Sequence, residues 1–448
     1  MRFSELDGAK VGVWGAGREI RSFAAQLARR LPAARIAVAV FDAPPPEDVR
    51  VALAAPEASI VDADGALAAL AGCDVLIRSP GVSIHRPQLR ALRDGGLQVT
   101  TATGLWLAER EGRAVIGVTG TKGKSTTAAL VVHLARAAGR TVHLAGNIGV
   151  PALDLLDHDP TEMAVVELSS YQVADLQFGP QTAVITSLFP EHTDWHGSFE
   201  GYREDKLRIL GLPGVHTAVL NGRSEQLVAA AAARAACELI PYGVPGGWDL
   251  TPLGIARVGE LALARAELPL RGEHNALNLC AALAALEAFG VALAPLPDAL
   301  QGFRALPHRL ETVAEREGVL WVNDSISTTP ESTLAALESF AEREILLIGG
   351  GQDRGQDYAA LARRLAETGA GVVGIPSTGP RLIAEARRAG VPAARALEAA
   401  DLRAAIALAR TLARAGTTVL LSPAAASYDH YRDFEERGEL FRALADPA

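Results

Sequence analysis

The chain has 448 residues, which at roughly 150 residues per domain predicts about three domains, each with its own core. Its 43 Lys and Arg against 52 Asp and Glu give a net charge of -9, which argues against broad binding to nucleic acid or to a membrane surface. The three cysteines show no paired spacing, and there is no run of 18 apolar residues or signal-peptide core. We therefore expect a cytoplasmic protein that binds any anionic substrate in a local basic pocket.

Short apolar runs alternate with Ala-, Leu- and Arg-rich stretches of helical period, which is the pattern of βαβ units. The predicted class is therefore α/β with parallel sheets. The first block has predicted strands at 10–14, 74–77 and 98–100. A further predicted strand ends near residue 42, before a proline break at 44–46. A charged stretch at 109–112 then indicates a domain boundary.

The second block has predicted strands at 114–118, 164–168, 182–186 and 217–220, and a predicted helix over about 275–289. A boundary near 303–307 precedes a third block, with predicted strands at 320–323, 345–348, 371–375 and 418–421. We therefore expect three domains, covering residues 1–109, 110–304 and 305–448.

A glycine- and lysine-rich loop lies between a predicted strand and a predicted helix, with the sequence Gly117-Val-Thr-Gly-Thr-Lys-Gly-Lys-Ser125. Backbone N–H groups of such a loop bind phosphate, Lys124 can reach the terminal phosphates and Ser125 can hold Mg²⁺. Only two residues separate Gly120 from Gly123, where the common phosphate loop has four. The alternative is a structural turn with incidental lysines.

A second glycine turn, Gly15-Ala-Gly17, follows the first predicted strand, and an acid, Asp42, ends the next strand. This resembles a dinucleotide-binding fingerprint, but Ile20 replaces the third glycine that allows close packing of helix and strand. Another phosphate at the helix N-terminus fits better than NAD, and a purely structural turn remains an alternative.

Further polar residues follow other predicted strands. Glu167 lies at a strand end where it can share Mg²⁺ with Ser125, although a helix cap explains the same letters. The segment 189–196 contains two His and two acids, and we interpret His192 as a Mg²⁺ ligand or orienting group, with zinc as the alternative. From spacing alone, Lys206 has the pattern of a solvated helix lysine.

Taken in order, the motifs resemble the Mur ligases, and within that family the enzymes that add glutamate to UDP-N-acetylmuramoyl-L-alanine. The resemblance covers essentially the whole chain and includes, beyond the phosphate loop, Gly146-Asn-Ile-Gly149, Glu167-Leu-Ser-Ser-Tyr-Gln172, His192-x-Asp194, Tyr202-Arg-x-x-Lys206, His274-Asn275, Pro307-His-Arg-Leu-Glu311, Asn323-Asp-Ser325, Leu421-Ser-Pro-Ala424 and Phe434-Glu-x-Arg-Gly438. It implies a monomer whose Rossmann-like first domain binds the UDP-sugar, whose phosphate-loop central domain binds ATP and whose Rossmann-like third domain binds the amino acid.

The resemblance also implies roles for particular residues. Those expected to bind ATP are Gly120, Thr121, Lys122, Gly123, Lys124, Ser125, Thr126, Asn278, Arg309 and Asp324. Those expected at the UDP-sugar are Gly17, Arg18, Glu19, Ser79, Gly81, Asn147, Ser169, Gln172 and His192. The implied catalytic residues are Lys124, Glu167, His192 and Lys206, and the implied Mg²⁺ ligands are Ser125, Glu167, His192 and a Lys206 carbamylated by CO₂.

The residues that the resemblance implies at the substrate glutamate are Thr328, Arg354, Ser427, Tyr428 and Phe434. Three letters in this domain depart from the common pattern, because Ile326 and Arg354 replace lysines and Tyr428 replaces a smaller apolar residue. An Arg fork binds a carboxylate bidentately, with a geometry different from that of a lysine. Together with the segment 188–197, these letters resemble the variant of the family that adds L-glutamate; addition of D-glutamate and, more remotely, folylpolyglutamate synthesis remain alternatives.

Overall fold

The computed structural model describes residues 1–42, 58–304 and 306–446. The predicted proline break at 44–46 and residue 305, the first of the third predicted domain, lie outside these residues. The chain forms two compact units, which are described separately. The first contains Met1–Leu268 and His274–Phe303, and the second contains Pro269–Glu273 and Arg304–Ala448. Among the described helices, none has the length and apolar character needed to cross a membrane.

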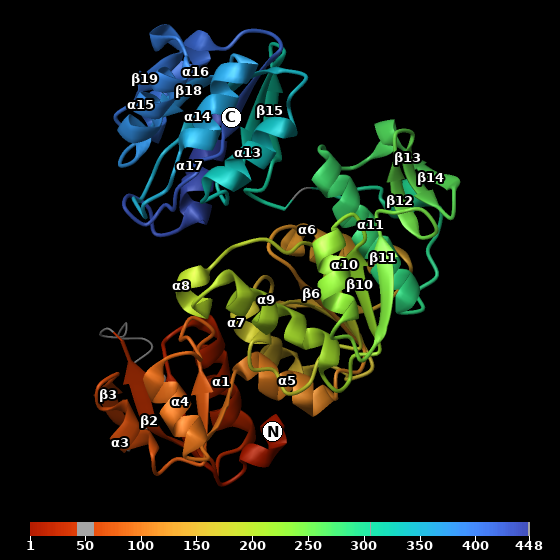
Figure 1. The fold of residues 1–448 in the computed structure, drawn as a ribbon, viewed down its shortest axis with the longest axis vertical. Coiled ribbons are helices and arrows are strands. Elements are labelled where there is room, and N and C mark those ends of the chain that lie inside the picture. Colours follow the sequence, from red (N-terminus) through yellow and green to blue (C-terminus); the bar gives the residue numbers. More distant parts are fainter. Residues whose placement is uncertain (43–57, 305, 447–448) are drawn as a thin grey trace. The chain divides into compact units, whose positions relative to one another are not determined.

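The first unit begins with a parallel five-stranded sheet (Figure 1). Its strands, in spatial order, are β3 (Ser59–Asp62), β2 (Arg35–Phe41), β1 (Lys10–Trp14), β4 (Val75–Arg78) and β5 (Gln98–Thr100). The helices of this region are α1 (Arg18–Arg30), α3 (Ala66–Leu70), α4 (Pro87–Asp94) and α5 (Ala102–Arg110). The turn after β1 passes directly into α1, which places residues 15–19 at the carboxyl edge of this sheet.

A second, six-stranded parallel sheet follows in the same unit. Its strands, in spatial order, are β11 (Glu238–Tyr242), β10 (Thr217–Asn221), β9 (Thr182–Ile185), β6 (Val115–Thr119), β8 (Met163–Glu167) and β7 (Val142–Gly146). Its helices are α6 (Lys124–Ala137), α7 (Ser170–Val173), α8 (Thr193–His196), α9 (Phe199–Leu207), α10 (Glu225–Ala232), α11 (Glu273–Ala288) and α12 (Leu296–Ala299). A small antiparallel sheet is formed by β12 (Trp248–Thr251), β13 (Gly254–Arg257) and β14 (Glu260–Ala264).

Two cores hold the second sheet. On one side, apolar residues of α6 and α11 pack with strand residues such as Ile116 and Val165 in a single buried cluster. On the other, Trp106 and Leu107 of α5 share a cluster with Leu153 and Leu176, so this core runs across the charged stretch at 109–112. Burial of this much apolar surface fixes the first sheet against the second within the unit. The predicted boundaries at 109/110 and 304/305 stay predictions.

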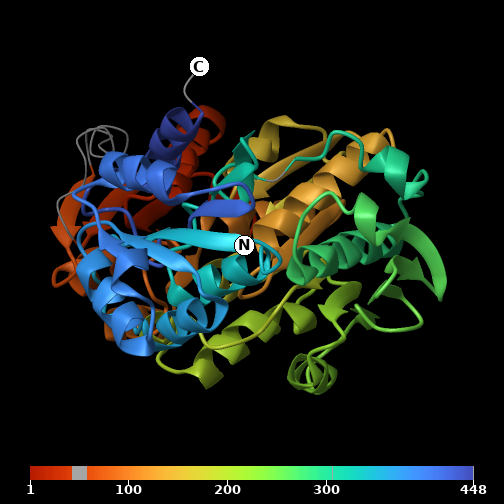
Figure 2. The same cartoon turned by 90° about the horizontal axis from the view of Figure 1, so that it is seen from above.

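The second unit contains a mixed six-stranded sheet with helices on both faces (Figure 2). The spatial order is β15 (Glu311–Arg316), β16 (Val319–Asn323), β20 (Thr417–Leu421), β17 (Glu344–Gly349), β18 (Gly371–Gly374) and β19 (Ala396–Glu398), and only the pairing of β15 with β16 is antiparallel. Helices α13 (Pro330–Glu338), α14 (Ala359–Thr368) and α15 (Gly379–Ala389) pack on one face, and α16 (Leu402–Leu412) and α17 (Phe434–Ala445) on the other. The predicted α/β class with parallel sheets is confirmed.

Candidate active site

Three neighbouring strands of the second sheet have their carboxyl ends at the same edge of that sheet. Strand β6 lies between β8 and β9, and all three run parallel. The glycine-rich loop follows β6, Glu167 is the last residue of β8, and the segment leading to His192 follows β9. In an open parallel sheet this carboxyl edge is where ligands bind. The topology therefore brings three separately predicted motifs to the same edge.

The loop after β6 has a backbone that requires glycine at two positions. Gly120 and Gly123 have φ values of +141° and +88°, a region that other residues rarely adopt. A Cβ atom on Gly120 would lie 2.0 Å from Oγ1 of Thr186, and one on Gly123 would lie 2.4 Å from Oδ1 of Asn278. Asn278 of α11 therefore lies directly against the loop.

The lysine that starts α6 lies over the same loop. Nζ of Lys124 donates hydrogen bonds to the carbonyl oxygens of Gly120, at 3.1 Å, and Thr121, at 3.0 Å. Ser125 and Thr126 are buried in the first turn of the helix. Backbone N–H groups and a positive charge at a helix N-terminus are suited to bind phosphate oxygens.

Glu167 is a buried carboxylate with one atom left unsatisfied. Its side chain is 1% exposed, and Oε1 accepts a hydrogen bond of 2.9 Å from Nδ2 of Asn147. Among the residues that the structure describes, Oε2 has no hydrogen-bond partner. Because a buried carboxylate oxygen without a partner is costly, this atom fits the coordination of a hard divalent cation such as Mg²⁺.

Lys206 of α9 is buried rather than solvated, so the interpretation from spacing alone was wrong. The residue is 1% exposed, and its Nζ donates to the carbonyl oxygen of Gly120, at 3.1 Å, and to Oγ1 of Thr119, at 3.4 Å. Burial, reinforced by the charge of Lys124, lowers the pKa of Lys206 well below its ordinary value. The neutral amine is therefore favoured at this position.

His192 precedes α8 and has a left-handed backbone, with φ of +55°. Its ring centre lies 5.0 Å from that of Tyr171. Burial lowers the pKa of the His192 imidazole, which favours the neutral form that binds metals. Its neighbour Glu191 accepts a hydrogen bond of 2.6 Å from Nζ of Lys122. Burial of the Glu191 carboxylate opposes ionisation, but the ion pair with Lys122 outweighs it and lowers the pKa of Glu191.

These groups surround a cavity of about 380 Å³ within the first unit. Gly120, Lys124 and Lys206 line it, together with eight of the nine residues expected at the UDP-sugar, namely Arg18, Glu19, Ser79, Gly81, Asn147, Ser169, Gln172 and His192. Gly17 is the ninth; it caps α1, and a Cβ atom there would lie 2.9 Å from Oγ of Ser79. The cavity thus has walls from both sheets of the unit.

Three of the residues expected at the UDP-sugar, Arg18, Glu19 and Gln172, also connect the two sheets. Nη2 of Arg18 donates to the carbonyl oxygen of Gly146 at 2.7 Å, and Nε2 of Gln172 donates to Oε1 of Glu19 at 2.5 Å. Thr103 donates to the second Glu19 oxygen at 3.1 Å, and burial raises the pKa of Glu19. A substrate that uses these side chains must share or replace the bonds between them.

Two cavity residues were given no role of their own by the sequence analysis. Tyr202 lines the cavity, and its hydroxyl lies 2.7 Å from Oγ1 of Thr121. Glu191 lines it too and holds Lys122. The two acids within the segment 189–196 gave a signal for Glu191, whereas the role of Tyr202 in holding the loop depends on a contact between residues 81 positions apart.

In the second unit, the residues expected at glutamate lie on loops after β16, β17 and β20, apart from Phe434, which begins α17. The guanidinium carbon of Arg354 lies 5.6 Å from the centre of the Tyr428 ring, a cation–π arrangement of two exposed side chains. Arg354 and Tyr428, two of the three residues that depart from the common family pattern, are therefore in contact. Thr328 is half-buried and Ser427 is buried.

Arg309 and Asp324, expected at the nucleotide, also belong to the second unit. Asp324 is buried; its Oδ2 accepts a hydrogen bond of 2.8 Å from Oγ of Ser422, and its Oδ1 accepts one of 3.2 Å from the backbone N–H of Leu310. Burial raises the pKa of Asp324 to about 6. Nearby, the fully buried Arg437 donates to the carbonyl oxygens of Ser325 and Ala425, which ties two of the loops together.

A phosphate loop, a buried carboxylate and a buried lysine at one sheet edge define an α/β protein suited to a nucleoside triphosphate with a divalent cation. Residues 118–286 match the Mur ligase middle domain, and residues 308–425 match the Mur ligase glutamate ligase domain. The chain belongs to the Mur ligase family.

Curated relatives match over the full length. The chain is 44% identical to a UDP-N-acetylmuramoyl-L-alanine–L-glutamate ligase of a Micromonospora species, covering 100% of this chain and 99% of that protein. It is 42% identical to the protein of the same name from Salinispora tropica, covering 100% of both. Among solved structures, the MurF ligase from Thermotoga maritima in complex with ADP has a TM-score of 0.62 at 17% identity, covering 99% of this chain and 96% of that one. At this identity the likeness shows the fold alone.

Proposed function

We propose that this chain is an ATP-dependent ligase that joins the amino group of L-glutamate to the alanyl carboxylate of UDP-N-acetylmuramoyl-L-alanine, releasing ADP and phosphate. The full-length relatives are named as ligases of UDP-N-acetylmuramoyl-L-alanine and L-glutamate, which supports the substrates and the L-configuration. We further propose that it works as a cytoplasmic monomer in peptidoglycan precursor synthesis, and that residues 1–109 bind the UDP-sugar, 110–304 bind ATP and 305–448 bind glutamate.

One observation carries the proposal. The phosphate loop with Lys124, the unsatisfied carboxylate oxygen of Glu167 and the buried amine of Lys206 all lie around one cavity or at its edge. A loop for phosphate alone would serve any nucleotide-binding protein. The same cavity also has a wall from the first sheet, including Arg18 and Ser79, which offers polar contacts to a second substrate besides the nucleotide.

The first chemical step activates a carboxylate, which by itself does not react with an amine because oxide is a poor leaving group. An oxygen of the alanyl carboxylate attacks the γ-phosphorus of ATP, the bond to the β-phosphate oxygen breaks, and ADP leaves. Lys124 and the N–H groups of the loop stabilise the negative charge on the transferring group. One Mg²⁺ held by Ser125 and Glu167, and a second held by His192, would supply further charge neutralisation when bound.

Lys206 fits a role as a carbamate. A neutral amine reacts with CO₂ to give a carbamate anion and a proton, and burial favours the neutral amine here. A cationic Lys206 would repel Lys124, whereas the carbamate would attract it and would add an anionic group near the metal ligands. The conversion therefore turns an unfavourable buried charge into a favourable one.

The second step joins the amine. The neutral amino group of glutamate attacks the acyl carbon, a tetrahedral intermediate forms, phosphate leaves with the bonding electrons, and the nitrogen loses a proton. Arg354 would hold a glutamate carboxylate bidentately, with Thr328, Ser427 and the backbone near Phe434 completing the site. The Tyr428 ring would fix the guanidinium plane, so that the carboxylate is presented in one orientation.

The proposal is tested by incubating the purified protein with ATP, Mg²⁺ and UDP-N-acetylmuramoyl-L-alanine, with L- or D-glutamate in separate tubes. Product mass and ADP release are followed. We expect a product with the mass of the dipeptide-bearing nucleotide in the L-glutamate tube, with one ADP per product. Product only with D-glutamate would reverse the stereochemical assignment. ADP release that needs neither the sugar nucleotide nor the amino acid would refute ligation.

Replacing Arg354 with Ala should raise the KM for glutamate by about 10- to 100-fold, because a charge-assisted pair with a carboxylate is lost. The KM for ATP should change little. Initial rates at varied glutamate and varied ATP measure both quantities. Arg364→Ala is the matched control, because Arg364 is on α14 and pairs with Glu338 on the protein surface. An equal KM for glutamate in Arg354→Ala and Arg364→Ala would rule out the proposed contact between Arg354 and the glutamate carboxylate.

A further inference from the structure

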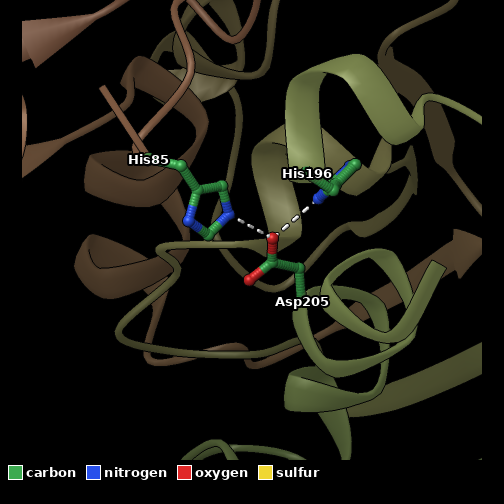
Figure 3. A group of neighbouring side chains, drawn as sticks. All are labelled: His85, His196 and Asp205. Carbon is green, nitrogen blue, oxygen red and sulfur yellow. Dashed lines mark hydrogen bonds and ion pairs between the residues drawn. The ribbon is translucent and has the colours of Figure 1, made fainter. Parts of the chain in front are cut away.

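A cluster of two histidines and an aspartate lies outside the groups used above (Figure 3). His85 lies on the loop between β4 and α4 in the first sheet's region, whereas His196 ends α8 and Asp205 is on α9. Figure 3 shows both rings directed at one carboxylate oxygen. Nε2 of His85 lies 2.8 Å, and Nδ1 of His196 lies 2.6 Å, from Oδ2 of Asp205.

We propose that His85, His196 and Asp205 form a binding site for a divalent transition-metal ion, with Zn²⁺ as the best fit. Two imidazole nitrogens and one carboxylate oxygen are the donors that zinc and its neighbours in the first transition row prefer, while Mg²⁺ prefers oxygen alone. The three ligand atoms lie within 4.8 Å of one another. A water molecule would complete a tetrahedral site with three protein ligands.

The groups around the cluster match those of known zinc sites. A metal-bound histidine usually donates its other ring N–H to an oxygen, which fixes the ring. Nε2 of His196 lies 3.0 Å from Oγ of Ser170, a hydroxyl that can accept this hydrogen bond.

The cluster is enclosed on one side and open on the other. The His196 side chain is fully buried, that of Asp205 is 14% exposed and that of His85 is 30% exposed. An ion can therefore enter from the side of His85. Zinc at about 2.0–2.1 Å from each donor places tetrahedral ligand atoms about 3.3 Å apart. The His85–Asp205 spacing of 2.8 Å must then widen by about 0.5 Å, and the His196–Asp205 spacing of 2.6 Å by about 0.7 Å. The loop position of His85 permits the first of these shifts.

A metal here would connect the two regions that build the main cavity. The loop with His85 follows Ser79 and Gly81, which line that cavity, and Asp205 directly precedes Lys206. The ion would replace hydrogen bonds between the two regions with metal–ligand bonds and hold both cavity walls in place. Its role is structural, and it is separate from the Mg²⁺ proposed at the phosphate loop.

The test uses the full-length protein after chelation and dialysis, in millimolar Mg²⁺, which occupies the oxygen-rich site at the phosphate loop. The background variant is His143→Gln, because His143, His158 and Glu162 form a second possible metal cluster. Zn²⁺ binding is measured by calorimetry, and Co²⁺ binding by the visible absorption bands of a tetrahedral complex. We expect one equivalent with a Kd of about 1 μM or tighter.

Adding His85→Gln or Asp205→Asn to this background should weaken Zn²⁺ binding by about 100-fold or more and remove the tetrahedral Co²⁺ bands. Zn²⁺ should raise the Tm of the background protein but not of these variants. His85→Gln changes a partly exposed loop residue, so it keeps the test valid if Asp205→Asn fails to fold. Unchanged affinity in His85→Gln, or no binding to the background protein, would overturn the proposal and leave the trio as a hydrogen-bonded bridge.

Discussion

Replacing Lys206 with Ala is expected to lower kcat by about 10³-fold, equivalent to roughly 4 kcal/mol of lost transition-state stabilisation. Its Nζ lies 3.1 Å from the Gly120 carbonyl oxygen at the centre of the phosphate loop, and burial favours the neutral amine that reacts with CO₂. Removing the side chain removes the carbamate, so the positive charge of Lys124 loses the negative group that attracts it. Steady-state rates of ADP release at saturating substrates measure the effect.

Small carboxylates distinguish a carbamate from a packing role for Lys206. Formate or acetate added to Lys206→Ala should restore part of the activity, because a free carboxylate can occupy the space left by the carbamate. The same additions should not stimulate the unaltered enzyme. Normal activity of Lys206→Ala without added carboxylate would remove the carbamate from the mechanism, and a loss that no carboxylate restores would favour a purely structural role.

Glu167→Gln is expected to lower kcat by about 10²-fold or more and to raise the Mg²⁺ concentration needed for half-maximal rate by about tenfold or more. Glutamine keeps the size of the side chain and an oxygen that can accept the hydrogen bond from Asn147. It replaces the unsatisfied anionic oxygen with a neutral amide. The rate measured over a range of Mg²⁺ concentrations separates weaker metal binding from slower chemistry.

Glu162→Gln provides the matched control for this substitution. Glu162 directly precedes β8, so it lies at the opposite end of the strand that ends at Glu167. It pairs with His143 outside the main cavity. The control should keep the Mg²⁺ dependence of the unaltered enzyme. A Glu167→Gln enzyme with the same Mg²⁺ dependence as the control would show that Glu167 does not hold the catalytic metal.

The sequence predicts best the elements whose signal is local. Buried strands such as β6 and β20 are short runs of mainly β-branched and aliphatic residues with burial at every position, so their place is visible from the letters alone. Strands β3 and β15 escaped prediction, because both lie at sheet edges and are mostly exposed or half-buried. Strand β19 has three residues, too few for a period to be recognised.

The candidate site divides in the same way. The phosphate loop is readable because its glycines and lysines are contiguous, and the carboxyl-edge rule places Glu167 beside it. The bond between Glu19 and Gln172 and the contact of His85 with Asp205 join residues 153 and 120 positions apart, so no local pattern reports them. The burial of Lys206 was hidden because its neighbours Glu204 and Asp205 are polar, and only tertiary packing covers the lysine.

The most direct test of the central claim is to follow oxygen from the carboxylate to phosphate. UDP-N-acetylmuramoyl-L-alanine labelled with ¹⁸O in both carboxylate oxygens is converted with ATP, Mg²⁺ and L-glutamate, and the released phosphate is analysed by mass. Attack of the carboxylate on the γ-phosphorus predicts one ¹⁸O in each phosphate and one in the new amide. Phosphate without label, released at a rate that does not depend on glutamate, would contradict activation of the carboxylate by ATP.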